Sequence, residues 1–426
     1  MKSKYLLWGF LVLLALFTAV SCKSTPPATP EEPVAETTDK DSAPPDKASL
    51  DALNAAAARA AAARKLVNDF DGSSLLPGDW QAADSLYSQA EQQKKTSTLK
   101  ETQESTARYN KAADAFEAMS GKTIALYYEK KKAELVKARA AAVSVGAASL
   151  IPDYLLEVDN VVADAEKKYQ AKDYYAAKDA AEKALSMYEA QKIAGDAYNK
   201  RGAVAVRAEE LTPEFLSDAD KVGLNAVDKY LAGDYRGAKE GAANALSMYQ
   251  ALGAGLDAYK VREEIANRGF ERFDSRNVAL ADDTLRAAAN DYTAKNFTAA
   301  KDKSDEALLR YNLALKTAWE GYAGERRTAA STERQRAMDA KANVAVRQDF
   351  NSAQAVLNQA NTAYQGKKFE EAALSYDNSG SMFTKAAQAA REKQRIAEEA
   401  LQRANQRMAE SDEKARNAEL ILEGGI

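Results

Sequence analysis

One pattern of aromatic residues recurs four times and constrains the fold more than any other feature of this chain. The clearest copy lies in residues 227–249, where Tyr230 and Tyr235 are five residues apart and Tyr249 follows fourteen residues later. The other copies keep this spacing: Tyr169, Tyr174 and Tyr188; Tyr292, Phe297 and Tyr311; Tyr364, Phe369 and Phe383. Such self-similarity indicates stacked helical repeats and predicts an all-α fold.

Each copy predicts a helical hairpin. Tyr230 ends one helix and Tyr235 begins the next. Between them, Gly233 can adopt the left-handed conformation that ends a helix. Asp234 can accept hydrogen bonds from the free N–H groups that begin the second helix, and Asp173 can do the same in its own copy. Small residues then follow at steps of three and four, which lets the two helices approach closely: Ala238, Ala242 and Ala245.

Three prolines mark helix starts, because proline is tolerated only in the first turn of a helix: Pro77, Pro152 and Pro213. Pro77 therefore indicates a degenerate first repeat, which follows an Ala-rich helix at residues 50–70. The second helices either continue for several turns or break at glycines such as Gly253 and Gly255. Each glycine costs a helix about 1 kcal/mol relative to alanine, but the composition favours one long helix.

These signals divide the chain into segments. We expect a signal peptide at 1–21, a tether at 22–47, a repeat array at 48–383 and a charged C-terminal helix at 384–426. The array holds five hairpins, at 75–130, 150–210, 211–272, 274–330 and 346–383. In the last helix the large apolar residues Ile396, Leu401 and Met408 do not sustain a heptad, so we expect no strong coiled coil. It is either a protruding or capping helix or a docking helix for a partner.

The N-terminus predicts export and lipidation. Two lysines precede a short apolar run at residues 5–17, which is typical of a signal peptide. The only cysteine, Cys22, follows Ser21 in a segment that resembles a lipobox. That resemblance implies cleavage between Ser21 and Cys22 and acylation of Cys22; the alternative is a plain signal peptide and a stray thiol. Residues 23–47 are rich in proline and acidic residues and fit an extended tether.

Composition argues against most enzyme classes. The chain has no histidine, which removes Ser-His-Asp and Cys-His arrangements and the usual zinc ligands. Carboxylates are abundant, but Asp173 and Asp234 fit helix caps, and Asp282 with Asp283 fits the first turn of a helix. We therefore predict no catalytic residue, no metal site and no cofactor. The net charge of −4 is spread along the chain and gives no basic footprint for nucleic acid.

The hairpin resembles the tetratricopeptide repeat. Tyr235, the turn before it, Ala238 and Ala245-Leu246 lie at the family spacing. Two features depart from it: Ala242 stands where the family has an aromatic residue, and the final aromatics are 61, 62 and 72 residues apart, against about 34 in the family. The resemblance implies a tetratricopeptide-like hairpin solenoid with long second helices and a long C-terminal helix. With its lipoprotein start, the chain is also similar to the helical-repeat membrane lipoproteins of spirochaetes, including those of treponemes.

Two functions follow as hypotheses. The first is a non-enzymatic scaffold that binds an envelope protein, since stacked repeats present extended surfaces. The alternative is a ligand-carrying accessory subunit of a solute transporter, with Tyr230, Tyr249 and Tyr259 lining a groove or cavity for a small molecule. In both cases we expect a lipid anchor on the periplasmic side of the cell membrane. Lys23 after the cysteine leaves the outer membrane open.

Overall fold

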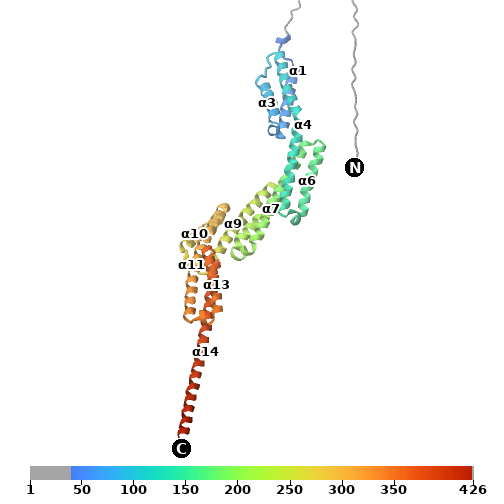
Figure 1. The fold of residues 1–426 in the computed structure, drawn as a ribbon. Helices are drawn as coiled ribbons and strands as arrows, with labels where there is room; N and C mark the ends of the chain where they lie inside the picture. Colours follow the sequence, from blue (N-terminus) through green and yellow to red (C-terminus); the bar gives the residue numbers. More distant parts are fainter. Residues whose placement is uncertain (1–39, 425–426) are drawn as a thin grey trace, which may run out of the picture. The chain divides into compact units, whose positions relative to one another are not determined.

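The computed structural model describes residues 40–424, and every regular element in this range is a helix (Figure 1). The prediction of an all-α fold is confirmed for these residues. None of the described helices combines the length and the apolar character needed to span a membrane. The chain divides into two compact units, one up to Tyr127 and one from Tyr128.

In the first unit three helices pack around a small core. They are α1 (Lys47–Asp69), α3 (Pro77–Gln92) and the first part of α4 (Leu99–Ser144), with the short α2 (Gly72–Leu75) between α1 and α3. Leu53 and Val67 of α1 are buried, as is Phe116 of α4. Arg64 of α1 binds Asp84 of α3 at 2.6 Å.

The second unit alternates short and long helices. The short helices all have 19 residues: α6 (Pro152–Gln170), α8 (Pro213–Leu231), α10 (Ser275–Thr293) and α13 (Arg347–Gln365). Each is followed by a long one: α7 (Tyr174–Leu211), α9 (Tyr235–Asn267), α11 (Phe297–Asp339) and α14 (Phe369–Glu423). Single-turn elements precede three of the short helices: α5 (Ala147–Leu150), η2 (Phe270–Phe273) and α12 (Ala342–Ala345).

The hairpin turns form as their sequence predicts. Gly233 is left-handed, with φ of 82°, and Asp234 accepts a hydrogen bond from the Gly237 N–H at 2.9 Å. Asp173 caps α7 in the same way, through the Ala176 N–H at 3.3 Å. In the other three turns a lysine takes the left-handed position: Lys172, Lys295 and Lys367. The prolines stand at the first positions of α3, α6 and α8, as expected.

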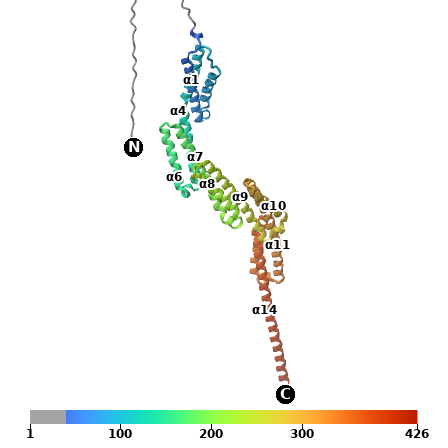
Figure 2. The same ribbon diagram turned by 180° about the vertical axis from the view of Figure 1, so that it is seen from behind.

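The long helices are unbroken, and α7, α9 and α11 each take part in two clusters of packed helices. Helix α9 passes through four glycines without interruption. Its buried residues pack on α8 and on the C-terminal half of α7, where Val204 and Ala208 are buried. Further along, Ile265 of α9 packs with α10 and α11 instead. Figures 1 and 2 show α8 beside both α7 and α9 from opposite sides. The repeating unit is thus a three-helix bundle, formed by two long helices and the short helix between them in the chain.

Two expectations are wrong in detail. No separate helix begins at residue 384, because α14 continues through this position without a break. Asp282 does not lie in the first turn of its helix, because α10 begins at Ser275. Asp282 instead faces the bundle, where it binds Arg262 at 2.8 Å and the Tyr311 hydroxyl at 2.5 Å.

Candidate ligand-binding site

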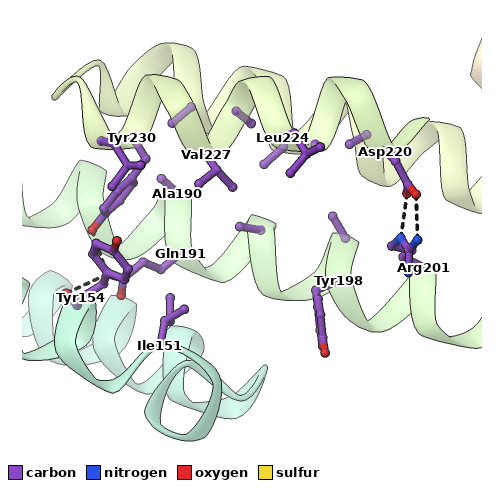
Figure 3. Close-up of a pocket in the computed structure, with 18 of the residues that line it drawn as sticks. Ile151, Tyr154, Ala190, Gln191, Tyr198, Arg201, Asp220, Leu224, Val227 and Tyr230 are labelled. Carbon is purple, nitrogen blue, oxygen red and sulfur yellow. Dashed lines mark hydrogen bonds and ion pairs between the residues drawn. The ribbon is translucent and has the colours of Figure 1, made fainter. Parts of the chain in front are cut away.

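A cavity of about 500 Å³ lies in the bundle of α7, α8 and α9 (Figure 3). Two of the three aromatic residues proposed from the sequence, Tyr230 and Tyr249, line it. Tyr259 does not; it lies further along α9, in a shallow hollow with Arg262 and Tyr311. The structure therefore brings together the first two residues only. The lipidation and cleavage residues, Cys22 and Ser21, lie outside the described residues.

The walls of the cavity are mostly apolar. Helix α7 contributes three alanines, α8 contributes Leu224, Ala226, Val227 and Leu231, and α9 contributes three more alanines; Ile151 and Tyr154 close the side at the start of α6. Figure 3 shows Leu224 and Val227 pointing from α8 toward α7. A cleft of this size and lining, with a few polar groups, is typical of sites that bind small organic molecules.

Gln191 supplies the polar group at one end of the cavity. Its Nε2 donates hydrogen bonds to the main-chain oxygen of Tyr154 at 3.0 Å and to the hydroxyl oxygen of Tyr230 at 2.8 Å. The main-chain oxygen can only accept, so it fixes the amide with its nitrogen on this side. Gln191 is 3% exposed, and its Oε1 has no hydrogen-bond partner among the described residues. A buried acceptor without a partner costs about 1–3 kcal/mol.

Tyr230 lies beside Gln191 and is held by aromatic contacts. Its ring meets Tyr154 edge to face at 6.0 Å and Tyr235 edge to face at 5.1 Å. Burial raises the pKa of Tyr230 to about 12, so the phenol is neutral at ordinary pH. Because its oxygen accepts from Gln191, its own proton can be donated to a ligand. The polar groups at this end of the cavity are therefore a buried acceptor on Gln191 and a phenol proton on Tyr230.

The opposite end of the cavity carries a charged link. Arg201 binds Asp220 through two hydrogen bonds of 2.7 Å, and the Tyr249 hydroxyl donates to the same carboxylate at 2.6 Å. Hydrogen bonds from Arg201 hold the pKa of Asp220 below its usual value. Burial raises the pKa of Tyr249. The carboxylate therefore stays ionised and fully engaged, which suits a structural role better than proton transfer.

The same link occurs in other bundles. Its members are Arg139, Asp159 and Tyr188 around α6, and Arg262, Asp282 and Tyr311 around α10. The tyrosine always follows the aspartate by 29 residues. In the α13 bundle, Arg334 binds Gln354 at 2.6 Å and Phe383 stands where the tyrosine would be. Since it also joins the helices of the α6 and α10 bundles, we interpret the link as a packing device that joins three helices.

A glycine distinguishes the α8 bundle from the others. The residue three positions after the aspartate or glutamine of the link is Val162, Leu285 or Leu357 in the other bundles of the second unit, but Gly223 in α8. In the first unit, where Arg64 binds Asp84, Tyr87 stands three positions after that aspartate. All four larger side chains are buried or partly buried. A Cβ atom on Gly223 would lie 3.6 Å from the Tyr249 hydroxyl and 3.8 Å from the Ala245 Cβ. No close approach requires glycine here, so its effect is to leave space open.

The exposed side chains of α8 at the rim of the cavity and the amide of Gln191 also differ from the residues at the matching positions of the other bundles. Leu224, Val227 and Leu231 are exposed by 66%, 50% and 59%. At the matching positions the other helices of the second unit carry only small or polar residues: Ala163, Glu166, Gln170, Arg286, Ala289, Thr293, Asn358, Asn361 and Gln365. Gln191 corresponds to Leu252, Ala314 and Ala386, all buried and apolar. The space, the apolar rim and the buried amide thus coincide in one bundle.

Comparison with known proteins identifies no relative: no family model, no curated protein and no solved structure matches this chain. The site rests on the geometry of this chain alone.

The sequence pattern concealed the most informative residues. Gly223 and Gln191 escape notice because neither belongs to the aromatic skeleton that defines the repeat. Aligning the repeats on the aspartate of the link would have found both, since each differs in kind from its counterparts. The arginine of the link was also missed, although an arginine stands 19 or 20 residues before each such aspartate or glutamine.

Proposed function

We propose that this chain is a non-enzymatic binding protein that carries a small, mainly apolar molecule in the cavity of the α8 bundle. The observation that supports this most is the buried, unpartnered Oε1 of Gln191 in a cavity that Gly223 opens. The ligand class follows from the lining. An apolar body would fill the space between the alanines and α8, and a hydroxyl, amine or protonated acid group would donate to Gln191.

The proposal includes the cellular localisation of the protein. The apolar run and lipobox-like Cys22 favour a lipid-anchored envelope protein of the kind found in spirochaetes, with the folded residues on the periplasmic side. We also propose that the repeats are tetratricopeptide-like. It is supported by the hairpin turns at Gly233 and its counterparts and by the contact of Tyr230 with Tyr235. The extensive packing between successive long helices distinguishes this array from a simple stack of hairpins.

Ligand binding can be tested with probes of equal length. The purified chain, made with Cys22→Ala so that it stays free of acyl chains, is titrated with dodecanol and with dodecane, and binding is read by native mass spectrometry and thermal shift. We expect dodecanol to bind with the higher affinity. Failure of both probes, together with failure of a wider set of apolar alcohols, amines and acids, would overturn the proposal.

A pair of matched substitutions tests whether the ligand binds in the cavity. Gly223→Leu restores the residue type of α10 and α13 and should fill the cavity, so probe binding is lost while the protein becomes more stable. Gly202→Leu is the control, because Gly202 lies on an exposed part of α7 where an added Cβ atom would have no neighbour within 4 Å. Equal loss of binding in both variants would show that the ligand binds elsewhere.

A protein-binding scaffold is the second candidate function. It is favoured by the apolar side chains that α8 exposes beside the cavity, chiefly Leu224 and Leu231. An envelope protein would cover them in a way that a small molecule cannot. Crosslinking in intact cells through a photoreactive residue at Leu231 tests this: a reproducible protein adduct supports the scaffold, and adducts limited to lipid or small molecules count against it.

A further inference from the structure

Helix α14 carries an apolar stripe in two parts, separated by Gln394. From Phe369 to Ala390 the stripe is buried in the last bundle, at alternating steps of four and three: Phe369, Ala373, Tyr376, Gly380, Phe383, Ala387 and Ala390. The next position in this register is the polar Gln394, after which the same steps continue toward the C-terminus as Ala397, Leu401, Ala404, Met408, Ser411, Ala415, Ala418 and Leu422. The large residues alone do not reveal this heptad, because the second apolar position of most repeats is occupied by alanine.

The second part of the stripe has no partner within the described part of the chain. Every residue from 391 to 424 is exposed, including Leu401, Met408 and Leu422 at 62%, 65% and 79%. Figure 1 shows this part of α14 extending beyond the last bundle. Isolated helices gain little stability in water without packing of an apolar face. The continuing register therefore points to a second helix that covers it.

The charges beside the stripe identify that helix. In heptad notation, with Leu401 and Met408 at a, Arg407 and Lys414 occupy g, and Asp412 and Glu419 occupy e. In a parallel pair of identical helices, each g residue faces the e residue five positions later on the other chain. Arg407 would then face Asp412, and Lys414 would face Glu419. In an antiparallel pair g would face g and e would face e, which places like charges together.

We propose that the exposed part of α14 pairs with the same segment of a second copy of this chain, as a parallel, in-register coiled coil. The pair is a modest one, because alanine and serine fill the d positions and bury little area. Anchoring two copies to one membrane would raise their local concentration and favour the pair. This proposal does not depend on the ligand cavity, so either can fail without the other.

Single cysteines test the pairing and its direction. In the full chain with Cys22→Ala, Leu401→Cys and Met408→Cys should each form a disulfide-linked dimer on mild oxidation, because equal a positions face each other in a parallel pair. Gln406→Cys, at the outer f position, is the control and should remain monomeric. An antiparallel pair would not link both positions to themselves. Equal linkage at 406 and 408 would indicate random collision and overturn the proposal.

A charge exchange tests partner choice without touching the apolar stripe. Lys414→Glu should raise the dimer dissociation constant in sedimentation experiments severalfold, because the introduced carboxylate would face Glu419 of the other copy. Adding Glu419→Lys should restore the wild-type value. These positions are exposed, so the helical content of the bundles should not change. A wild-type chain that stays monomeric at its highest soluble concentration, or a charge exchange without effect, contradicts the parallel pair.

Discussion

The bundles around α8 and α10 share their framework and differ in what fills it. Both have a 19-residue short helix between two long helices, and both have the Arg–Asp–Tyr link in the same place. In the α10 bundle Leu285 packs in the core and the outer face of the helix carries Arg286. In the α8 bundle Gly223 leaves a cavity and Leu224 is exposed beside it. A repeat can therefore gain a cavity by exchanging side chains on the same helical framework.

The comparison also separates structural from functional residues. What the two bundles share, such as Asp220 and Asp282 with their arginines, is needed to join the helices. Residues that only the α8 bundle has, such as Gly223 and Gln191, are not needed for folding, because the other bundles form without them. Residues of the second kind are the ones on which we base the ligand site.

The largest expected effect comes from making the α10 bundle resemble the α8 bundle. Leu285→Gly removes a partly buried side chain from the core and places a glycine inside a helix. Adding the cost of a cavity to that of the glycine, we expect a loss of about 3 kcal/mol in the free energy of unfolding. Urea denaturation measures it, with Ala289→Gly on the same helix as the control for glycine alone. Equal losses in the two variants would mean that the α10 core is not filled by Leu285.

The next effect concerns the buried amide. Gln191→Leu introduces the residue that α9 has at the matching position, Leu252, and removes an acceptor without a partner. The stability of the protein without ligand should change little, because losing the two hydrogen bonds to Tyr154 and Tyr230 offsets the removal of the unpartnered acceptor. The preference for an alcohol over the alkane of equal length should fall about tenfold, which corresponds to one hydrogen bond. Calorimetric titration of both probes checks this; an unchanged preference would show that the donor does not meet Gln191.

The sequence predicted the framework better than the site, for a physical reason. Hairpins, caps and helix starts depend on local signals, and Gly233, Asp234 and Pro213 each behaved as expected. In the structure Tyr230 lines the cavity of the α8 bundle and Tyr259 does not. Tyr230 lies on α8 and Tyr259 on α9, and the packing of the helices, which the sequence does not give, decides which one lines the cavity. Asp282 was misplaced because its partner, Arg262, lies in another helix.

A third prediction concerns the link itself. Tyr249→Phe removes one hydrogen bond to Asp220 and should reduce the free energy of unfolding by about 1 kcal/mol. The α13 bundle, with Gln354 and Phe383 in these places, suggests that the two residues change together. Tyr249→Phe combined with Asp220→Gln should therefore cost less than the sum of the single changes. A double-mutant cycle by urea denaturation measures the difference, and strict additivity would contradict the coupling.

The smallest effect is the pH dependence that the link confers. Arg201 lowers the pKa of Asp220 in the folded protein relative to its unfolded value of about 3.9. A group with a lowered folded pKa contributes stability above its unfolded pKa and loses that contribution as the pH falls through the folded pKa. The stability difference between the wild type and Asp220→Asn should thus be constant above about pH 5 and shrink as the solution is acidified. Denaturation midpoints between pH 7 and pH 2 measure it. Asp51→Asn, on the exposed face of α1, should follow the wild type throughout. If Asp220→Asn also runs parallel to the wild type at every pH, then Arg201 does not act on Asp220 as its hydrogen bonds indicate, and the shared link would stabilise the bundles through packing alone.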